Sequence, residues 1–183
     1  MIRREQAWKR FVIVPVVVLA VIGCFLLLGY LAALALRVPL YLGLSAGARL
    51  LGAGLLVVAF GLWAWLFRCR KPADVLTSTY LTFSRAFQKV ELAQDLGRTE
   101  PLVVKGPYKL VRHPIYLAVL VSLVGWGVLM DLSFILLATP FALAWFYLVV
   151  MPFEEKELLA LFGRDYEEYM KRVRRIVPIP RHP

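Results

Sequence analysis

Residues 105–130 read KGPYKLVRHPIYLAVLVSLVGWGVLM, a basic loop that passes without a spacer into apolar sequence. Arg112, His113 and Pro114 lie at the junction. A bilayer core about 30 Å thick needs roughly 20 apolar residues of helix to cross it. The stretch therefore predicts a membrane helix that begins at Pro114, a favoured first-turn residue, and whose entry point carries ionisable side chains.

The composition indicates an integral membrane protein. Of the 183 residues, 61% are hydrophobic, whereas soluble domains usually contain about 45–50% apolar residues. The formal net charge is +10, but in so apolar a chain basic residues report membrane topology, and no nucleic-acid partner is expected. The two cysteines, Cys24 and Cys69, have the spacing of neither a disulfide framework nor a metal site.

Four apolar segments are predicted to span the membrane. They cover residues 11–36, 50–67, 115–130 and 132–150. The second contains GAGLL, whose small residues permit close contact between helices. The third is short for a full crossing, and only Asp131 separates it from the fourth, so these two should form a tight antiparallel hairpin.

The predicted fold class is all-α: an integral membrane protein with four transmembrane helices, a C-terminal helix hairpin and a cytosolic amphipathic C-terminal helix. One membrane domain, residues 1–183, comprises two N-terminal spans (1–67), a cytosolic loop (68–114), the transmembrane hairpin (115–153) and a cytosolic C-terminal region (154–183) that can lie on the membrane surface and cover what is below it. In that last region one helix face carries Leu158, Leu161, Phe162, Tyr166 and Tyr169. Gly163 is a candidate break.

The basic residues predict the orientation. Four precede the first span, nine lie between the second and third spans, and seven follow the fourth, which makes 20 of the 22. The loop between the first two spans holds only Arg37 and Arg49, and the Asp131 turn holds none. Cytosolic loops are enriched in Lys and Arg, so both termini are expected in the cytosol. A short, loop-poor chain is typical of prokaryotes, which would place it in the plasma membrane.

This topology brings two polar segments to one face of the membrane. His113 begins the third span, and Glu154 and Glu155 follow the fourth, so these residues should lie close together. Ionisable groups at the hydrocarbon edge are costly unless they are paired or solvated. They should therefore bind each other or a polar ligand. The alternative is that Arg112 extends to lipid headgroups and that Tyr108 and Tyr116 belong to an interfacial aromatic belt.

Common catalytic signatures are absent from the sequence. It contains no GxGxxG, GxxxxGK[ST], HExxH or CxxC motif, and His113 and His182 are its only histidines. No catalytic metal is expected from these residues. An enzyme of this composition would bind and orient a cofactor that is itself reactive.

The pattern G-x-Y-x-x-x-R-H-P-x-Y, followed after the hairpin by E-E and F-G-x-x-Y-x-x-Y, covers about residues 100–180. It resembles the membrane methyltransferase family of isoprenylcysteine carboxyl methyltransferases and phospholipid methyltransferases. The resemblance implies an S-adenosylmethionine site, with S-adenosylhomocysteine as product, open to the cytosol and to the bilayer. The implied partners are a lipophilic or lipidated acceptor and membrane lipids. No oligomeric state is implied.

The resemblance also implies site residues. Arg112 and Glu155 are predicted to be catalytic. The predicted cofactor-binding residues are Glu100, Leu102, Val103, Tyr108, His113, Pro114, Ile115, Tyr116 and Glu154. Tyrosine faces can stabilise a sulfonium by cation–π contact, and Arg112 can bind a carboxylate with two hydrogen bonds.

The chain departs from the carboxyl methyltransferase pattern at two positions. Glu100 stands where those enzymes have histidine, and apolar residues around Val150 stand where they have an arginine that contacts substrate. A prenylcysteine carboxylate would lack that partner, so a lipid amine or another hydrophobic thiol or amine is equally compatible. Two other functions stay open: an NADPH-dependent reductase of the sterol-reductase type, and a non-catalytic membrane scaffold.

Overall fold

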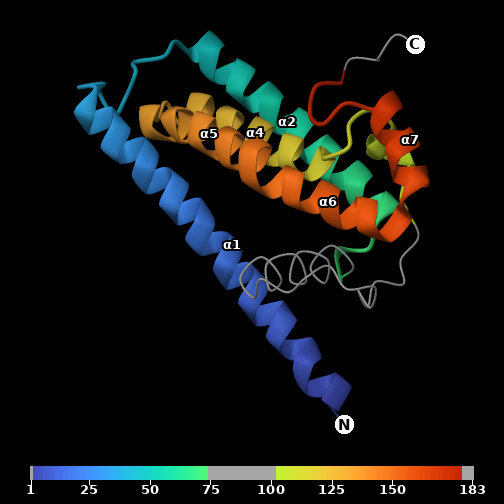
Figure 1. The fold of residues 1–183 in the computed structure, drawn as a ribbon. Coiled ribbons are helices and arrows are strands. Elements are labelled where there is room, and N and C mark those ends of the chain that lie inside the picture. Colours follow the sequence, from blue (N-terminus) through green and yellow to red (C-terminus); the bar gives the residue numbers. More distant parts are fainter. Residues whose placement is uncertain (1, 74–101, 179–183) are drawn as a thin grey trace.

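A computed structural model describes residues 2–73 and 102–178, and gives the backbone path alone for residues 2–11. Helices make up most of this part of the chain (Figure 1). They are α1 (Ile2–Ala35), α2 (Ala46–Cys69), the 3-10 helix η1 (Gly106–Lys109), α4 (Pro114–Leu129), α5 (Ser133–Trp145), the π-helix η2 (Phe146–Val150), α6 (Met151–Phe162) and α7 (Arg164–Arg172).

The predicted all-α membrane architecture is confirmed at this level. Within the described residues, three helical stretches are long and apolar enough to cross a membrane: Val12–Ala35, Ala46–Cys69 and Ser133–Phe162. The fourth, α4, is apolar but shorter, with 16 residues. At 1.5 Å per residue it is about 24 Å long, somewhat less than a bilayer core. The protein is multi-pass, and the number of complete crossings stays a prediction.

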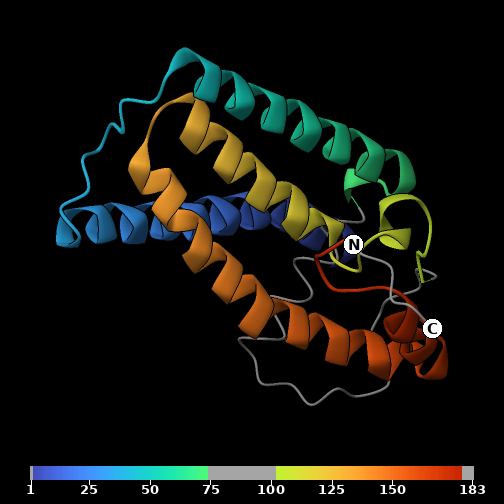
Figure 2. The same ribbon diagram turned by 90° about the horizontal axis from the view of Figure 1, so that it is seen from above.

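The helices pack in two pairs, α2 against α4 and α1 against α5, which the α4–α5 hairpin joins. Figure 2 shows α2 and α4 side by side along their length. Their close approach depends on Gly52 of the GAGLL segment. A Cβ at Gly52 would lie 2.6 Å from the Leu129 nitrogen and 3.0 Å from the Gly125 oxygen, so only glycine fits there. The predicted role in close helix contact is confirmed for Gly52, whereas a Cβ at Gly54 would meet nothing within 4 Å.

The fourth predicted span does not end where its hydropathy falls. From Ser133 the helix continues through Phe162, over 30 residues, or about 45 Å. The π-helix η2 interrupts the α-helical pattern where the Met151 N–H bonds to the Phe146 carbonyl. Pro152 follows directly and cannot donate to an α-helical bond, which accounts for the wider turn. The carboxylates of α6 therefore extend from the same rod that forms the hairpin.

Asp131 ties the α4–α5 turn to the loop between α1 and α2. Its carboxylate accepts hydrogen bonds from the backbone N–H groups of Gly43 and Leu44, both at 3.1 Å, and from the Arg49 guanidinium at 2.9 Å. Its backbone is left-handed, with φ of 61°, a conformation that aspartate tolerates better than most residues. The single charge between the last two spans is thus a structural anchor.

The chain turns back at its C-terminal end. Gly163, with φ of 50°, ends α6, which confirms the predicted break. α7 buries Tyr166 and Tyr169 and exposes Arg164, Asp165 and Glu167. Residues 173–178, here called the tail, then run beside the segment before α4. The Arg112 and His113 N–H groups donate to the carbonyls of Arg174 and Arg175, at 2.8 and 3.0 Å.

Candidate functional site

The loop before α4 is held against the end of α2. Gly106 has a φ of 61°, and a Cβ there would collide with the Cys69 sulfur and approach Trp65 Nε1 to 3.2 Å, so this turn requires glycine. The turn begins η1, in which Pro107 and Tyr108 are buried. The Tyr169 hydroxyl of α7 donates to the Tyr108 carbonyl at 2.6 Å. Helices α2 and α7 thus fix the segment that leads into Arg112 and His113.

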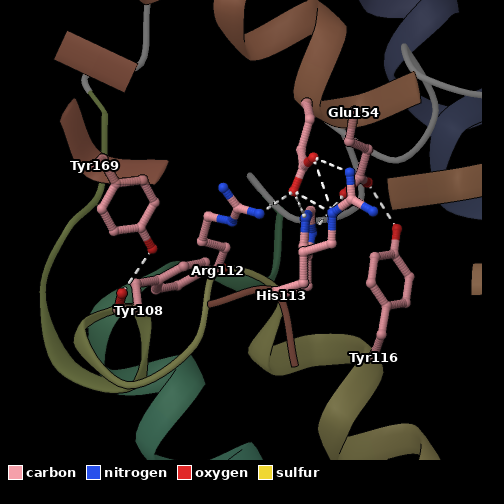
Figure 3. A network of polar contacts seen from close by, with 8 residues as sticks. Tyr108, Arg112, His113, Tyr116, Glu154 and Tyr169 are labelled. Atoms are coloured by element: carbon pink, nitrogen blue, oxygen red, sulfur yellow. Dashed lines mark hydrogen bonds and ion pairs between the residues drawn. The ribbon is translucent and has the colours of Figure 1, made fainter. Parts of the chain in front are cut away.

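His113 directly precedes α4 and faces two carboxylates of α6, as predicted. Its Nδ1 lies 3.4 Å from Glu154 Oε2, and its Nε2 lies 3.2 Å from Glu155 Oε1. The Tyr116 hydroxyl, one helical turn further on, donates to Glu154 Oε1 at 2.7 Å (Figure 3). The predicted proximity of these polar groups across the hairpin is therefore confirmed.

Glu155 is the centre of a buried charge network. Its side chain is only 5% exposed and contacts Arg112 Nη2 at 3.0 Å as well as His113. Arg175 of the tail binds the same carboxylate, with Nε 3.1 Å from both oxygens and Nη2 2.7 Å from Oε2. A buried carboxylate is tolerated when it is paired and its lone pairs are satisfied, and this network meets both conditions.

The network also sets the charge of His113. Burial by itself lowers the pKa of an imidazole. Here the hydrogen bonds with Glu154 and Glu155, and the negative charges of both, outweigh burial and raise the pKa of His113 above its ordinary value of 6.5. The protonated ring can donate to both carboxylates at once.

α7 closes this region with two buried tyrosines, whose rings lie 5.8 Å apart. Burial raises the pKa of both Tyr166 and Tyr169, so their hydroxyls stay neutral. The Tyr166 hydroxyl has no hydrogen-bond partner among the described residues, and neither has Arg112 Nε. Buried polar atoms without partners are uncommon, so these two point to a ligand that would bind them.

The polar groups border a cavity of about 460 Å³. Its polar part is formed by the start of α4, by Glu154 and by the tyrosines of η1 and α7. Its apolar part is formed by α1 and α5; Phe25, Trp145 and Val18 belong to it. Phe146 joins the two parts, because its ring lies 4.7 Å from that of Tyr116 and 6.1 Å from that of Phe25.

Most predicted site residues line this cavity, and they come from the loop before α4, which includes η1, from the start of α4 and from α6. Those in the lining are Leu102, Val103, Tyr108, Arg112, His113, Pro114, Ile115, Tyr116 and Glu154. Glu155, predicted to be catalytic, is not among the lining residues. Its carboxylate instead binds Arg112, His113 and Arg175. Glu100 lies outside the described residues.

Several residues of this region were not predicted from the sequence. The α1 face formed by Val14, Val18, Val21 and Phe25 lines the cavity, although it was interpreted only as a generic span. Its spacing of three and four residues, on a helix that is apolar all round, gave no signal that distinguishes a cavity face from a lipid face. Arg175 was counted only toward the cytosolic positive charge.

The comparison with known families agrees with this geometry. Residues 48–165, which include α2, the hairpin and α6, match the family model described as phospholipid methyltransferase. The chain therefore belongs to this family of methyltransferases. The resemblance drawn from the RHP and Glu-Glu motifs is confirmed.

Individual relatives align over shorter stretches. A Bradyrhizobium diazoefficiens protein named methanethiol S-methyltransferase 2 is 37% identical over 94 residues, covering 51% of this chain and 33% of its own length. A rice protein (Oryza sativa subsp. indica) named probable protein-S-isoprenylcysteine O-methyltransferase is 36% identical over 77 residues, covering 42% of this chain and 40% of its own length. Each match thus spans well under two thirds of the relative. No solved structure matches the chain.

Proposed function

We propose that this protein is a membrane methyltransferase that uses S-adenosylmethionine and methylates a lipophilic acceptor. The observation that carries the proposal is the two-part cavity, whose polar part begins at His113 and Glu154 and whose apolar part lies between α1 and α5. A polar, charged cofactor and a hydrophobic acceptor could meet there, at the level of Phe146.

The polar part suits the chemistry of the cofactor. Glu154 offers a carboxylate for hydroxyl or ammonium groups, and the unpartnered Arg112 Nε and Tyr166 hydroxyl offer donors for a carboxylate. The rings of Tyr108, Tyr116 and Tyr166 line the same part and could face a sulfonium, which aromatic rings attract. These residues therefore fit S-adenosylmethionine.

The cofactor, when bound, supplies a methyl group on a positively charged sulfur. The residues of the chain would bind and orient the cofactor and the acceptor. The charge network holds His113 in place, and the apolar walls keep water from the acceptor. Orientation alone can contribute several orders of magnitude to such a rate.

The group that receives the methyl is proposed not to be a carboxylate. Among the described lining residues of α1 and α5 there is no cation, and both Arg112 and His113 are already bound to Glu155. A hydrophobic thiol or a lipid amine therefore suits the apolar part better than a carboxylate. The relative named methanethiol S-methyltransferase has a thiol acceptor of this kind by its name, whereas the isoprenylcysteine relative is named an O-methyltransferase.

We place the polar part on the cytosolic face, with both termini. The 20 basic residues outside the Arg37–Arg49 loop support this orientation. In a prokaryote the membrane would be the plasma membrane.

Calorimetry of the detergent-purified protein tests the proposal. S-adenosylhomocysteine and S-adenosylmethionine should bind with a stoichiometry of one, and NADPH should not. Transfer of radiolabel from S-adenosylmethionine should then be compared for a long-chain thiol, a phosphatidylethanolamine and a farnesylcysteine. Binding of NADPH alone would favour a reductase, and binding of neither cofactor would favour a scaffold.

A further inference from the structure

Arg175 holds the charge network from outside the cavity. Its guanidinium binds the Glu155 carboxylate through Nε and Nη2, and its Cζ lies 5.2 Å above the ring of Tyr147. Two parallel hydrogen bonds between a guanidinium and a carboxylate fix both the distance and the plane of the pair. Arg175 is not among the residues that line the cavity, so any effect it has on a ligand must pass through Glu155.

Two side chains of the network contact the same oxygen of Glu155. Arg112 Nη2 and His113 Nε2 both approach its Oε1, at 3.0 and 3.2 Å. Only a carboxylate held in one orientation can serve both. Arg175 supplies that restraint, because its shortest contact, 2.7 Å, is with the other oxygen, Oε2.

The backbone of the tail acts on the same residues. The carbonyls of Arg174 and Arg175 accept from the N–H groups of Arg112 and His113, and Ile176 packs against the core cluster that contains Phe25 and Leu120. The backbone of the tail therefore aligns the segment before α4. The side chain of Arg175 aligns Glu155.

We propose that Arg175 is a positioning residue for methyl transfer: by binding Glu155 in two hydrogen bonds, it fixes the places of Arg112 and His113 at the cavity wall. This inference rests on the proposed function. The tail, which follows α7, thereby takes part in shaping the site through Glu155.

The arrangement predicts a specific electrostatic effect. His113 is faced by Glu154 and Glu155 from α6 and by the Tyr116 ring from α4. Arg112 of its own segment binds the same Glu155 oxygen, and the neutral Tyr166 of α7 lines the same cavity. Removing the positive charge of Arg175 leaves Glu155 less neutralised, so the carboxylate should stabilise protonated His113 more strongly. A residue that merely supported the fold would have no reason to shift the titration in this direction.

Nuclear magnetic resonance of the histidine ring tests this effect. The chain has two histidines, His113 and His182, so in the His182→Gln background His113 gives the only histidine signal. In that background Arg175→Gln should raise the titration midpoint of His113 by about one pH unit. Arg174→Gln is the matched control, because it removes the same charge from an adjacent, exposed side chain. Equal midpoints in the two variants, or a lower one in Arg175→Gln, would overturn the inference.

Affinity for S-adenosylhomocysteine gives a second readout, measured by calorimetry on the same variants. Arg175→Gln should bind about tenfold more weakly than Arg174→Gln. If Arg175→Gln does not fold, Arg175→Lys decides: lysine keeps the charge but lacks the planar pair of N–H groups that bind a carboxylate in parallel, so affinity should fall about threefold with a nearly unchanged His113 midpoint. Wild-type affinity in Arg175→Lys would then reject the inference. The titration needs no ligand, so it can succeed even if the proposed function fails.

Discussion

Glu154 and Glu155 are neighbours on α6, yet Glu154 lines the cavity whereas Glu155 binds Arg112 and Arg175 behind its wall. Glu154 accepts from the Tyr116 hydroxyl and keeps a quarter of its side chain exposed. Successive residues of a helix point about 100° apart, so one carboxylate can face a ligand while the next faces the protein. The two positions should therefore respond differently to the same substitution.

Glu154→Gln should weaken binding of S-adenosylhomocysteine while the fold is retained. The loss of a charged acceptor should cost about 1.5–3 kcal/mol of binding free energy, measured by calorimetry. Glu167→Gln and Glu168→Gln are matched controls, because both glutamates are exposed on α7. Small and equal effects at all three positions would argue against a ligand at Glu154.

Glu155→Gln should instead destabilise the protein. The substitution leaves Arg112, His113 and Arg175 without their shared counter-charge, and breaking a buried ion pair in this way costs about 3–5 kcal/mol. The melting temperature in detergent measures the effect. Glu168→Gln, which removes only exposed pairs with Arg164 and Arg172, should cost less than about 1 kcal/mol. An Glu155→Gln protein as stable as this control would show that the network contributes little.

The sequence was sufficient for the parts of the site that depend on local pattern and short connections. The short turn at residues 130–132, whose only charge is Asp131, forces α4 and α5 to be antiparallel. This placed His113 beside Glu154 and Glu155. Gly163 marked the end of α6. In both cases the determining residues are close in sequence or joined by a hairpin.

Other parts depend on contacts that no local pattern encodes. Arg175 reaches Glu155 only because the tail turns back beside residues 111–113, and its sequence context differs little from that of Arg174. The Asp131 anchor requires the conformation of a distant loop. The continuous rod from α5 to α6 was divided at Val150 because hydropathy reports the surroundings of a helix, whereas its backbone hydrogen bonds continue into the polar region.

Stability should fall as the pH rises through the titration of His113. Because the folded-state pKa of His113 is raised above 6.5, its contribution is complete below about pH 6.5 and is lost as the pH passes the raised value. The difference in melting temperature between wild type and His113→Asn should therefore shrink from about pH 6 to pH 9. A difference that grows over this range would contradict the assigned sign.

The predicted topology places the loop between α1 and α2 outside the cell and α7 inside. In a background with Cys24→Ala and Cys69→Ala, Tyr41→Cys should react with a membrane-impermeant maleimide in intact cells, because Tyr41 is 68% exposed. Glu167→Cys on α7 should react only after the cells are opened. The reverse labelling pattern would invert the orientation and place the cavity's polar part on the outer face.

His113→Ala should weaken binding of S-adenosylhomocysteine with the fold largely retained. The ring lines the cavity and is held between two carboxylates, so its loss removes a polar wall group and releases Glu154. A role confined to the network would lower the melting temperature but leave the affinity per folded molecule unchanged. His113→Asn should keep part of the affinity, since an amide preserves one donor and one acceptor. Calorimetry and thermal melting on both variants separate these outcomes, and full methyl transfer by His113→Ala with an accepted substrate would remove this histidine from the site.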